Sequence, residues 1–120
     1  MKREQSKEDY LEAILQLSKK QEKVKSIDVA NKLGFSKPSV SVAVKKLKQE
    51  NYIDIEKDGS LILTESGMYI AQITLDKHEF LTKFFISIGV TPIQAEEEAC
   101  EIEHSISEDT FLKMKNHFKL

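Results

Sequence analysis

The feature that most constrains the fold is the order of elements in the first half of the chain. Three segments in which apolar residues recur every three or four positions, a spacing typical of amphipathic helices, precede two short apolar runs at residues 52–55 and 61–63. The stretch between these runs contains Asp58-Gly59, and Asp-Gly is a strong signal for a tight hairpin turn. The sequence therefore predicts three helices followed by a β-hairpin.

Local signals predict where the helices begin and end. Gly34 and Gly89 are expected to end the second helix and a long fourth helix. A hydroxyl side chain that can cap a helix N-terminus stands at the start of each predicted helix: Ser6, Ser26, Ser36, Thr64, Thr91 and Ser107.

Three helices followed by a hairpin are the order of a winged helix-turn-helix, and the short link after Gly34 suits the tight turn of that motif. The expected fold is mostly α, with a small β-hairpin wing in an N-terminal domain at residues 1–72. An all-α domain follows at residues 73–120, with the boundary inside the long helix.

In such a fold the third helix enters the major groove of DNA, and its first residues meet base edges. The candidates for base contact are Ser36, Lys37, Pro38, Ser39 and Ser41. The candidates for phosphate contact include Lys45 and Lys46 on the helix and Lys57 on the wing. Two alternatives stay open, because winged helices also serve as protein-interaction modules and lysines line many solvated helix faces.

The net charge of −2 argues against a nucleic-acid partner only when it is averaged over the chain. Residues 1–75 carry 13 basic and 11 acidic side chains, a net of +2, whereas residues 76–120 carry 5 and 9, a net of −4. The basic half is therefore the half that carries the predicted DNA-binding motif.

A second motif lies in the acidic half, where Cys100, Glu103 and His104 follow the i, i+3, i+4 spacing that places them on one helix face. Thiolate, carboxylate and imidazole groups are all capable metal ligands. Asp9 and Glu12 form a similar pair in the first helix. The alternative for each group stays open. In other proteins, carboxylates on a helix surface are more often solvated, a lone histidine such as His78 is more often structural, and a lone cysteine is more often a small core residue.

Six segments, taken in order, resemble the metal-dependent repressors of the diphtheria toxin repressor and manganese transport regulator family. They are residues 6–14 (SKEDYLEAI), 37–41 (KPSVS), 61–67 (LILTESG), 78–81 (HEFL), 88–90 (IGV) and 100–105 (CEIEHS). The resemblance covers essentially the whole chain. It implies a homodimeric transcriptional repressor that binds a palindromic double-stranded operator, with the second domain serving in dimerisation. The length is that expected of a member without the third, SH3-like domain.

The resemblance also implies a set of metal ligands: Asp9, Glu12, His78, Cys100, Glu103 and His104. Asp9 and Glu12 match the manganese-type branch, whereas Cys100 matches the iron-type branch. The expected cofactor is accordingly Fe²⁺ or Mn²⁺, with Zn²⁺ or Co²⁺ as substitutes in vitro, because a thiolate favours softer cations than a carboxylate does.

Other functions fit the sequence less well. The chain has no nucleophile elbow, phosphate-binding loop or HExxH motif, so an enzyme acting on a small organic substrate is not expected. A single cysteine and the absence of a long apolar run predict a cytoplasmic protein without a membrane partner. The alternative that stays open is a winged-helix regulator that does not depend on metal.

Overall fold

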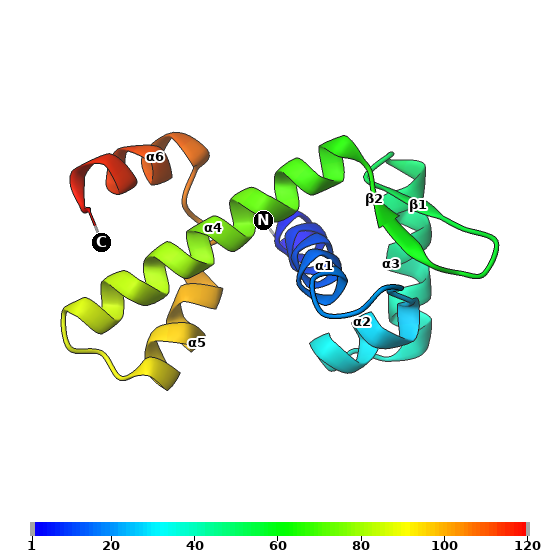
Figure 1. Ribbon diagram of the computed structural model, residues 1–120, viewed down its shortest axis with the longest axis horizontal. Coiled ribbons are helices and arrows are strands. Elements are labelled where there is room, and N and C mark those ends of the chain that lie inside the picture. Colours follow the sequence, from blue (N-terminus) through cyan, green and yellow to red (C-terminus); the bar gives the residue numbers. More distant parts are fainter. Residues whose placement is uncertain (1, 120) are drawn as a thin grey trace. The chain divides into compact units, whose positions relative to one another are not determined.

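The computed structural model describes residues 2–119, which form six helices and one antiparallel hairpin (Figure 1). The elements are α1 (Lys2–Ser18), α2 (Ser26–Leu33), α3 (Lys37–Gln49), β1 (Ile53–Ile55), β2 (Leu61–Leu63), α4 (Glu65–Ser87), α5 (Pro92–Ile102) and α6 (Glu108–His117). The chain forms two compact units, Met1–Gln72 and Ile73–Leu120, and the division falls inside α4. This architecture confirms the predicted fold class, a winged helix-turn-helix followed by helices.

The first unit is built around side chains that its helices and hairpin bury together. Leu11, Val29 and Val40, from α1, α2 and α3, are completely buried, as is Ile53 of β1. The two strands pair with Ile53 opposite Leu63, so Ile53 and its diagonal neighbour Leu61 face the helices while Asp54 faces solvent. Figure 1 shows the hairpin lying alongside α3, as a wing does in this fold.

The wing is attached to the loop that precedes α2. The backbone N–H of Leu61 donates to the carbonyl of Val24 over 2.7 Å. At the hairpin tip, Lys23 Nζ lies 2.8 Å from Asp58 Oδ2, and Asp58 Oδ1 accepts from the N–H of Ser60 at 3.0 Å. Both oxygens of the Asp58 carboxylate are thus engaged, which fixes the hairpin tip. The same interactions hold the pKa of Asp58 well below its ordinary value.

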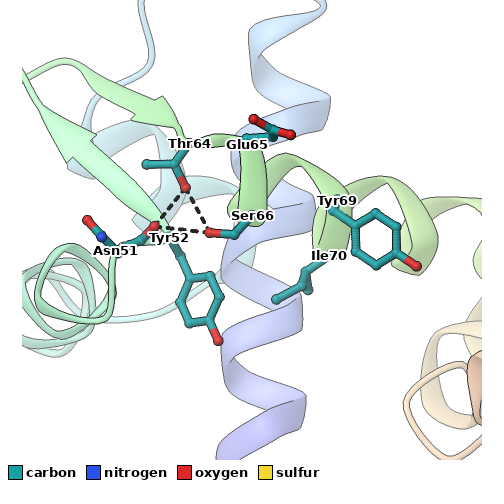
Figure 2. Close-up of a pocket in the computed structure, with 7 residues that line it drawn as sticks. All are labelled: Asn51, Tyr52, Thr64, Glu65, Ser66, Tyr69 and Ile70. Atoms are coloured by element: carbon teal, nitrogen blue, oxygen red, sulfur yellow. Dashed lines mark hydrogen bonds between the residues drawn. The ribbon is translucent and has the colours of Figure 1, made fainter.

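The start of α4 is bound closely to the segment that leads into the wing (Figure 2). The hydroxyls of Thr64 and Ser66 both donate to the carbonyl of Asn51, at 2.7 and 3.1 Å, and Thr64 Oγ1 caps the helix by accepting from the N–H of Gly67. Gly67 packs so closely on the carbonyl of Tyr52 that any Cβ there would overlap it. This close approach explains why a glycine stands in the first turn of α4.

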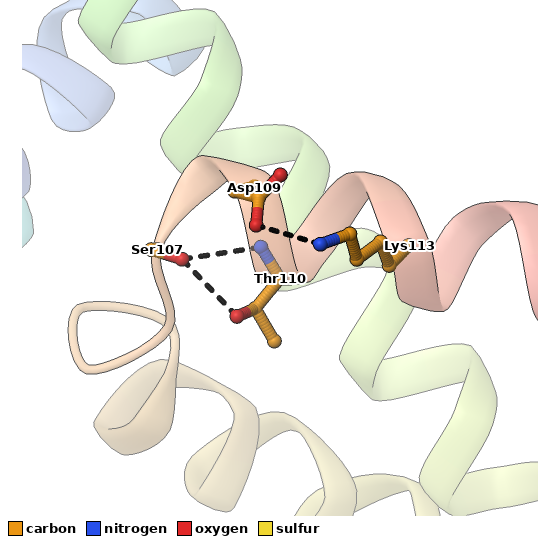
Figure 3. A network of polar contacts seen from close by, with 4 residues as sticks. All are labelled: Ser107, Asp109, Thr110 and Lys113. Atoms are coloured by element: carbon orange, nitrogen blue, oxygen red, sulfur yellow. Dashed lines mark hydrogen bonds and ion pairs between the residues drawn. The ribbon is translucent and has the colours of Figure 1, made fainter.

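The second unit places α5 and α6 against the C-terminal half of α4 (Figure 1). Its core joins Phe80 and Leu81 of α4 to Ala99 of α5 and Phe111 of α6, and the rings of Phe80 and Phe111 meet edge to face. Figure 3 shows how α6 begins, with Ser107 Oγ accepting from the N–H of Thr110 at 3.1 Å.

The structure tests each predicted helix start. The predicted hydroxyl caps at Ser36, Thr64, Thr91 and Ser107 are confirmed. In each case the side-chain oxygen accepts a hydrogen bond from the backbone N–H three residues later. The prediction at Ser6 is wrong, because α1 extends back to Lys2 through Arg, Glu and Gln, which favour helix. Ser26 is the first helical residue of α2 and not its cap. At this helix start Asp28 Oδ2 accepts from the N–H of Lys25.

Candidate nucleic-acid interface and metal centre

Helix α3 has one face in the core and the opposite face in solvent. Val40, Val44 and Leu47 are buried at a spacing of four and three residues, which fixes the rotation of the helix about its axis. The predicted DNA-contact residues at the start of α3 and along it are consequently exposed, and Lys57 on the wing is exposed as well: Ser36, Lys37, Pro38, Ser39, Ser41, Lys45, Lys46 and Lys57.

Two of these serines also build the helix start. Ser36 Oγ accepts from the N–H of Ser39 at 3.3 Å and donates to Ser39 Oγ at 2.9 Å. The hydroxyl proton of Ser36 is thus used inside the protein, whereas Ser39 keeps its own proton to donate outward. Ser36 is therefore better suited to accepting from a base than to donating.

Lys57 lies in the turn of the wing, next to the Lys23–Asp58 ion pair. Because Asp58 is already paired with Lys23, its negative charge is partly compensated beside Lys57. The turn therefore presents Lys57 as an available cation in a segment that also carries Glu56.

The second unit brings three of the predicted metal ligands together. His78 lies on α4, Glu103 follows the last residue of α5, and His104 is next in the chain. His78 Nδ1 is 3.4 Å and His104 Nε2 is 3.9 Å from the same oxygen, Glu103 Oε1. The exposed fractions of the three side chains are 16%, 5% and 0% for His78, His104 and Glu103.

The Glu103 carboxylate is unusual because it is completely buried and neither oxygen accepts a hydrogen bond from any described residue. A buried carboxylate without such partners costs several kcal/mol to desolvate, roughly, unless a positive charge compensates it. Imidazole nitrogens and a carboxylate are donors that Fe²⁺, Mn²⁺ and Zn²⁺ all accept. The residues present therefore fit a divalent cation.

The other three predicted ligands have different surroundings. Cys100 is exposed on α5, three residues before Glu103. Asp9 and Glu12 lie three residues apart on α1, in the first unit, with Asp9 half-buried and Glu12 buried. Asp9 and Glu12 thus share one helix, whereas Cys100 lies on α5 and Glu103 follows the last residue of that helix.

One polar residue near this cluster was not identified from the sequence. Lys77, the residue before His78, is buried, and its Nζ donates to the carbonyl of Ile106 at 2.5 Å. That carbonyl lies in the loop that follows His104, so Lys77 holds the segment bearing two of the cluster's three side chains. Its sequence position gives no sign of this, because a lysine on a helix is usually solvated.

None of the helices in the described part of the chain is long and apolar enough to cross a membrane. Two family profiles match the sequence almost end to end. Residues 4–61 match the iron-dependent repressor N-terminal DNA-binding domain, and residues 64–119 match the iron-dependent repressor metal-binding and dimerisation domain.

The chain is also similar to individual transcriptional regulators. An uncharacterized HTH-type transcriptional regulator of Methanocaldococcus jannaschii is 34% identical over 92% of this chain and 90% of its own length. The transcriptional regulator MntR of Escherichia coli is 31% identical over 86% of this chain and 66% of its length. The solved manganese regulator SloR superposes with a TM-score of 0.81 and 32% identity, covering 92% of this chain and 52% of SloR. The chain thus spans about half the length of this solved regulator.

Proposed function

This chain belongs to the iron-dependent repressor family, whose members are DNA-binding transcriptional repressors and not enzymes, and we propose that it represses transcription in response to Fe²⁺ or Mn²⁺. In this proposal it acts in the cytoplasm as a homodimer on a palindromic operator and controls genes of metal homeostasis. The match to a metal-binding and dimerisation domain favours this function over a winged-helix regulator that does not depend on metal.

The observation that carries the proposal is the buried Glu103 carboxylate beside His78 and His104. We assign the ligand set as Asp9, Glu12, His78, Cys100, Glu103 and His104. A bound divalent cation would compensate the negative charge of these carboxylates and the thiolate.

The two parts of the chain have separate tasks in the proposal. Residues 1–72 hold the DNA-contact residues, and residues 73–120 hold the dimer contacts and most of the ligands. Asp9 and Glu12 belong to α1, so a shared cation ties the DNA-binding part to the dimerisation part. A coupling of about 1–3 kcal/mol between the sites changes DNA affinity about 5–150-fold, which is sufficient for a switch.

Exposed apolar side chains support dimerisation through the second part. Ile88 and Ile93 are 63% and 75% exposed, near the loop between α4 and α5, and Leu112 and Phe118 are also exposed. Apolar groups at this density on a unit of about fifty residues are typical of an interface.

The test is an operator titration with and without a chelator. His104→Ala is expected to abolish the stimulation of operator binding by Mn²⁺ or Fe²⁺ while the helical circular dichroism signal is kept. His117→Ala, which removes an exposed histidine of α6, is the matched control and should retain full stimulation. An operator affinity that is the same with and without metal in the unaltered protein would overturn the proposal.

The choice of metal depends on Cys100. Cys100→Glu replaces a soft thiolate with a hard carboxylate, so the preference for Fe²⁺ over Mn²⁺ should fall. Parallel anaerobic titrations of both variants with the two metals measure the ratio. An unaltered ratio excludes Cys100 from the ligand set.

A further inference from the structure

Helix α3 carries an apolar side chain where a solvated helix normally carries a polar one. Val42 is 69% exposed, although it lies in the middle of the helix. It follows Val40 and precedes Val44 by two residues each, and both of these are buried, so Val42 points away from the core. Most of its side chain is therefore open to contact with a partner outside the fold.

The neighbours of Val42 on this outward face define what that partner is. Pro38 lies one turn before Val42, and Lys45 and Lys46 lie one turn after it. All three are exposed. An apolar centre flanked by cations is complementary to a surface that has anionic edges and an apolar group between them. The major groove of DNA at a thymine has this form, because phosphates line its edges and the thymine methyl group lies inside it.

The rest of the helix offers few alternatives for reading bases. α3 contains no arginine or asparagine, and its one glutamine, Gln49, is at its C-terminal end. Bidentate recognition of guanine by arginine or of adenine by asparagine is therefore not available from this helix. Discrimination among bases must come from hydroxyls, from lysines and from apolar contact with the thymine methyl group.

We propose that Val42 is a specificity-determining residue that packs against the C5-methyl group of a thymine in each operator half-site. This inference rests on the proposed DNA-binding function. It adds a defined chemical preference, for a base that bears a 5-methyl group over one that lacks it. 5-Methylcytosine carries the same methyl group and tests the same contact.

The experiment begins with selection of an operator by the 120-residue chain in the presence of Mn²⁺. Each thymine of one half-site is then replaced in turn by uracil, which removes only the methyl group. Loss of one buried methyl contact is expected to weaken binding about fourfold at one position. Val42→Ala should bind thymine and uracil equally well at that position, whereas Val42→Thr, which keeps a branched side chain with one methyl group, should retain part of the difference.

Gln49→Ala is the matched control on the same helix, because Gln49 is exposed at the C-terminal end of α3 and is not among the predicted DNA-contact residues. Its ratio of thymine to uracil affinity should equal that of the unaltered protein. Because Val42 is exposed and alanine favours helix more than valine does, Val42→Ala should keep the melting temperature or raise it slightly. The proposal is overturned if no thymine is sensitive to loss of its methyl group, or if Val42→Ala keeps the sensitivity. Failure to select any operator overturns the proposed function as well, so the two failures are distinguishable.

Discussion

The two units of this protein carry their functional charges in opposite environments. In the first unit, the lysines of α3 and of the wing are exposed, and the half of the chain that contains them has a net charge of +2. In the second unit, within the acidic half of net charge −4, the central carboxylate of Glu103 is completely buried. Exposed cations interact weakly and are screened by salt, so they suit a surface that binds a polyanion through many contacts. A buried carboxylate interacts strongly with few partners, so it suits the capture of one ion.

The strongest way to break this comparison is Glu103→Gln, which keeps the shape of the side chain and removes its charge. We expect Mn²⁺ affinity to fall more than about 100-fold, since loss of an outer-shell partner alone costs about 10–100-fold. The metal-free variant should melt at a higher temperature than the unaltered protein, because a buried amide costs less to desolvate than a carboxylate without hydrogen-bond partners. Calorimetric titration and thermal unfolding measure the two effects.

Glu101→Gln is the matched control, since Glu101 is an exposed carboxylate two residues away on α5. It changes the net charge by the same amount and should leave both quantities unaltered. If the two variants lose Mn²⁺ affinity equally, the overall acidity of the second unit, and not the buried carboxylate, attracts the metal.

The comparison between buried and exposed charge can be sharpened with two lysines of the second unit. Lys77→Met removes the buried donor to the carbonyl of Ile106 and should lower the free energy of unfolding by about 1–3 kcal/mol. Lys113→Met removes an ion pair with Asp109 in which both side chains are 77% exposed, and should cost about 0.5 kcal/mol or less (Figure 3). Urea denaturation distinguishes them.

Lys77→Met should also weaken metal binding, because the loop that carries His104 loses its anchor. Equal unfolding free energies for the two lysine variants would mean that the buried hydrogen bond contributes no more than a surface ion pair.

Elements whose signals are local could be predicted from the sequence. Ser36 and Ser107 cap helices through hydrogen bonds to residues three positions away, so their role is contained in a short segment. Ser6 has the same residue type but lies inside α1, because the residues before it continue the helix. A cap signal is decisive only where the preceding residues do not favour helix.

Features that depend on packing between distant segments were less accessible. Glu103 and His104 are consecutive residues just after α5, and the family resemblance, not the i, i+3, i+4 spacing, joined them to His78 of α4 in one ligand set. Nothing in the sequence distinguishes Lys77 from the solvated lysines, because its burial depends on α4 packing against the loop after α5. The exposure of Val42 follows from the burial of Val40 and Val44, which the helical period predicts, yet valine alone gives no sign of facing solvent.

The smallest expected effect concerns the wing, where charges that are exposed still interact specifically. Lys23 and the N–H of Ser60 lower the pKa of Asp58 from its ordinary value of 3.8. As pH falls below 3.8, the unfolded chain binds a proton at Asp58 before the folded chain does. The stability that this carboxylate contributes is therefore present above pH 3.8 and is lost in more acidic solution.

Asp58→Asn should therefore flatten the acid limb of the unfolding free energy, and only slightly, because solvent screens an exposed pair. Lys23→Met combined with Asp58→Asn should flatten it no further than Asp58→Asn alone. If the double variant is additive, Lys23 and Asp58 do not act as a pair, and the wing is held to the loop before α2 by the bond between Leu61 and Val24 without their help.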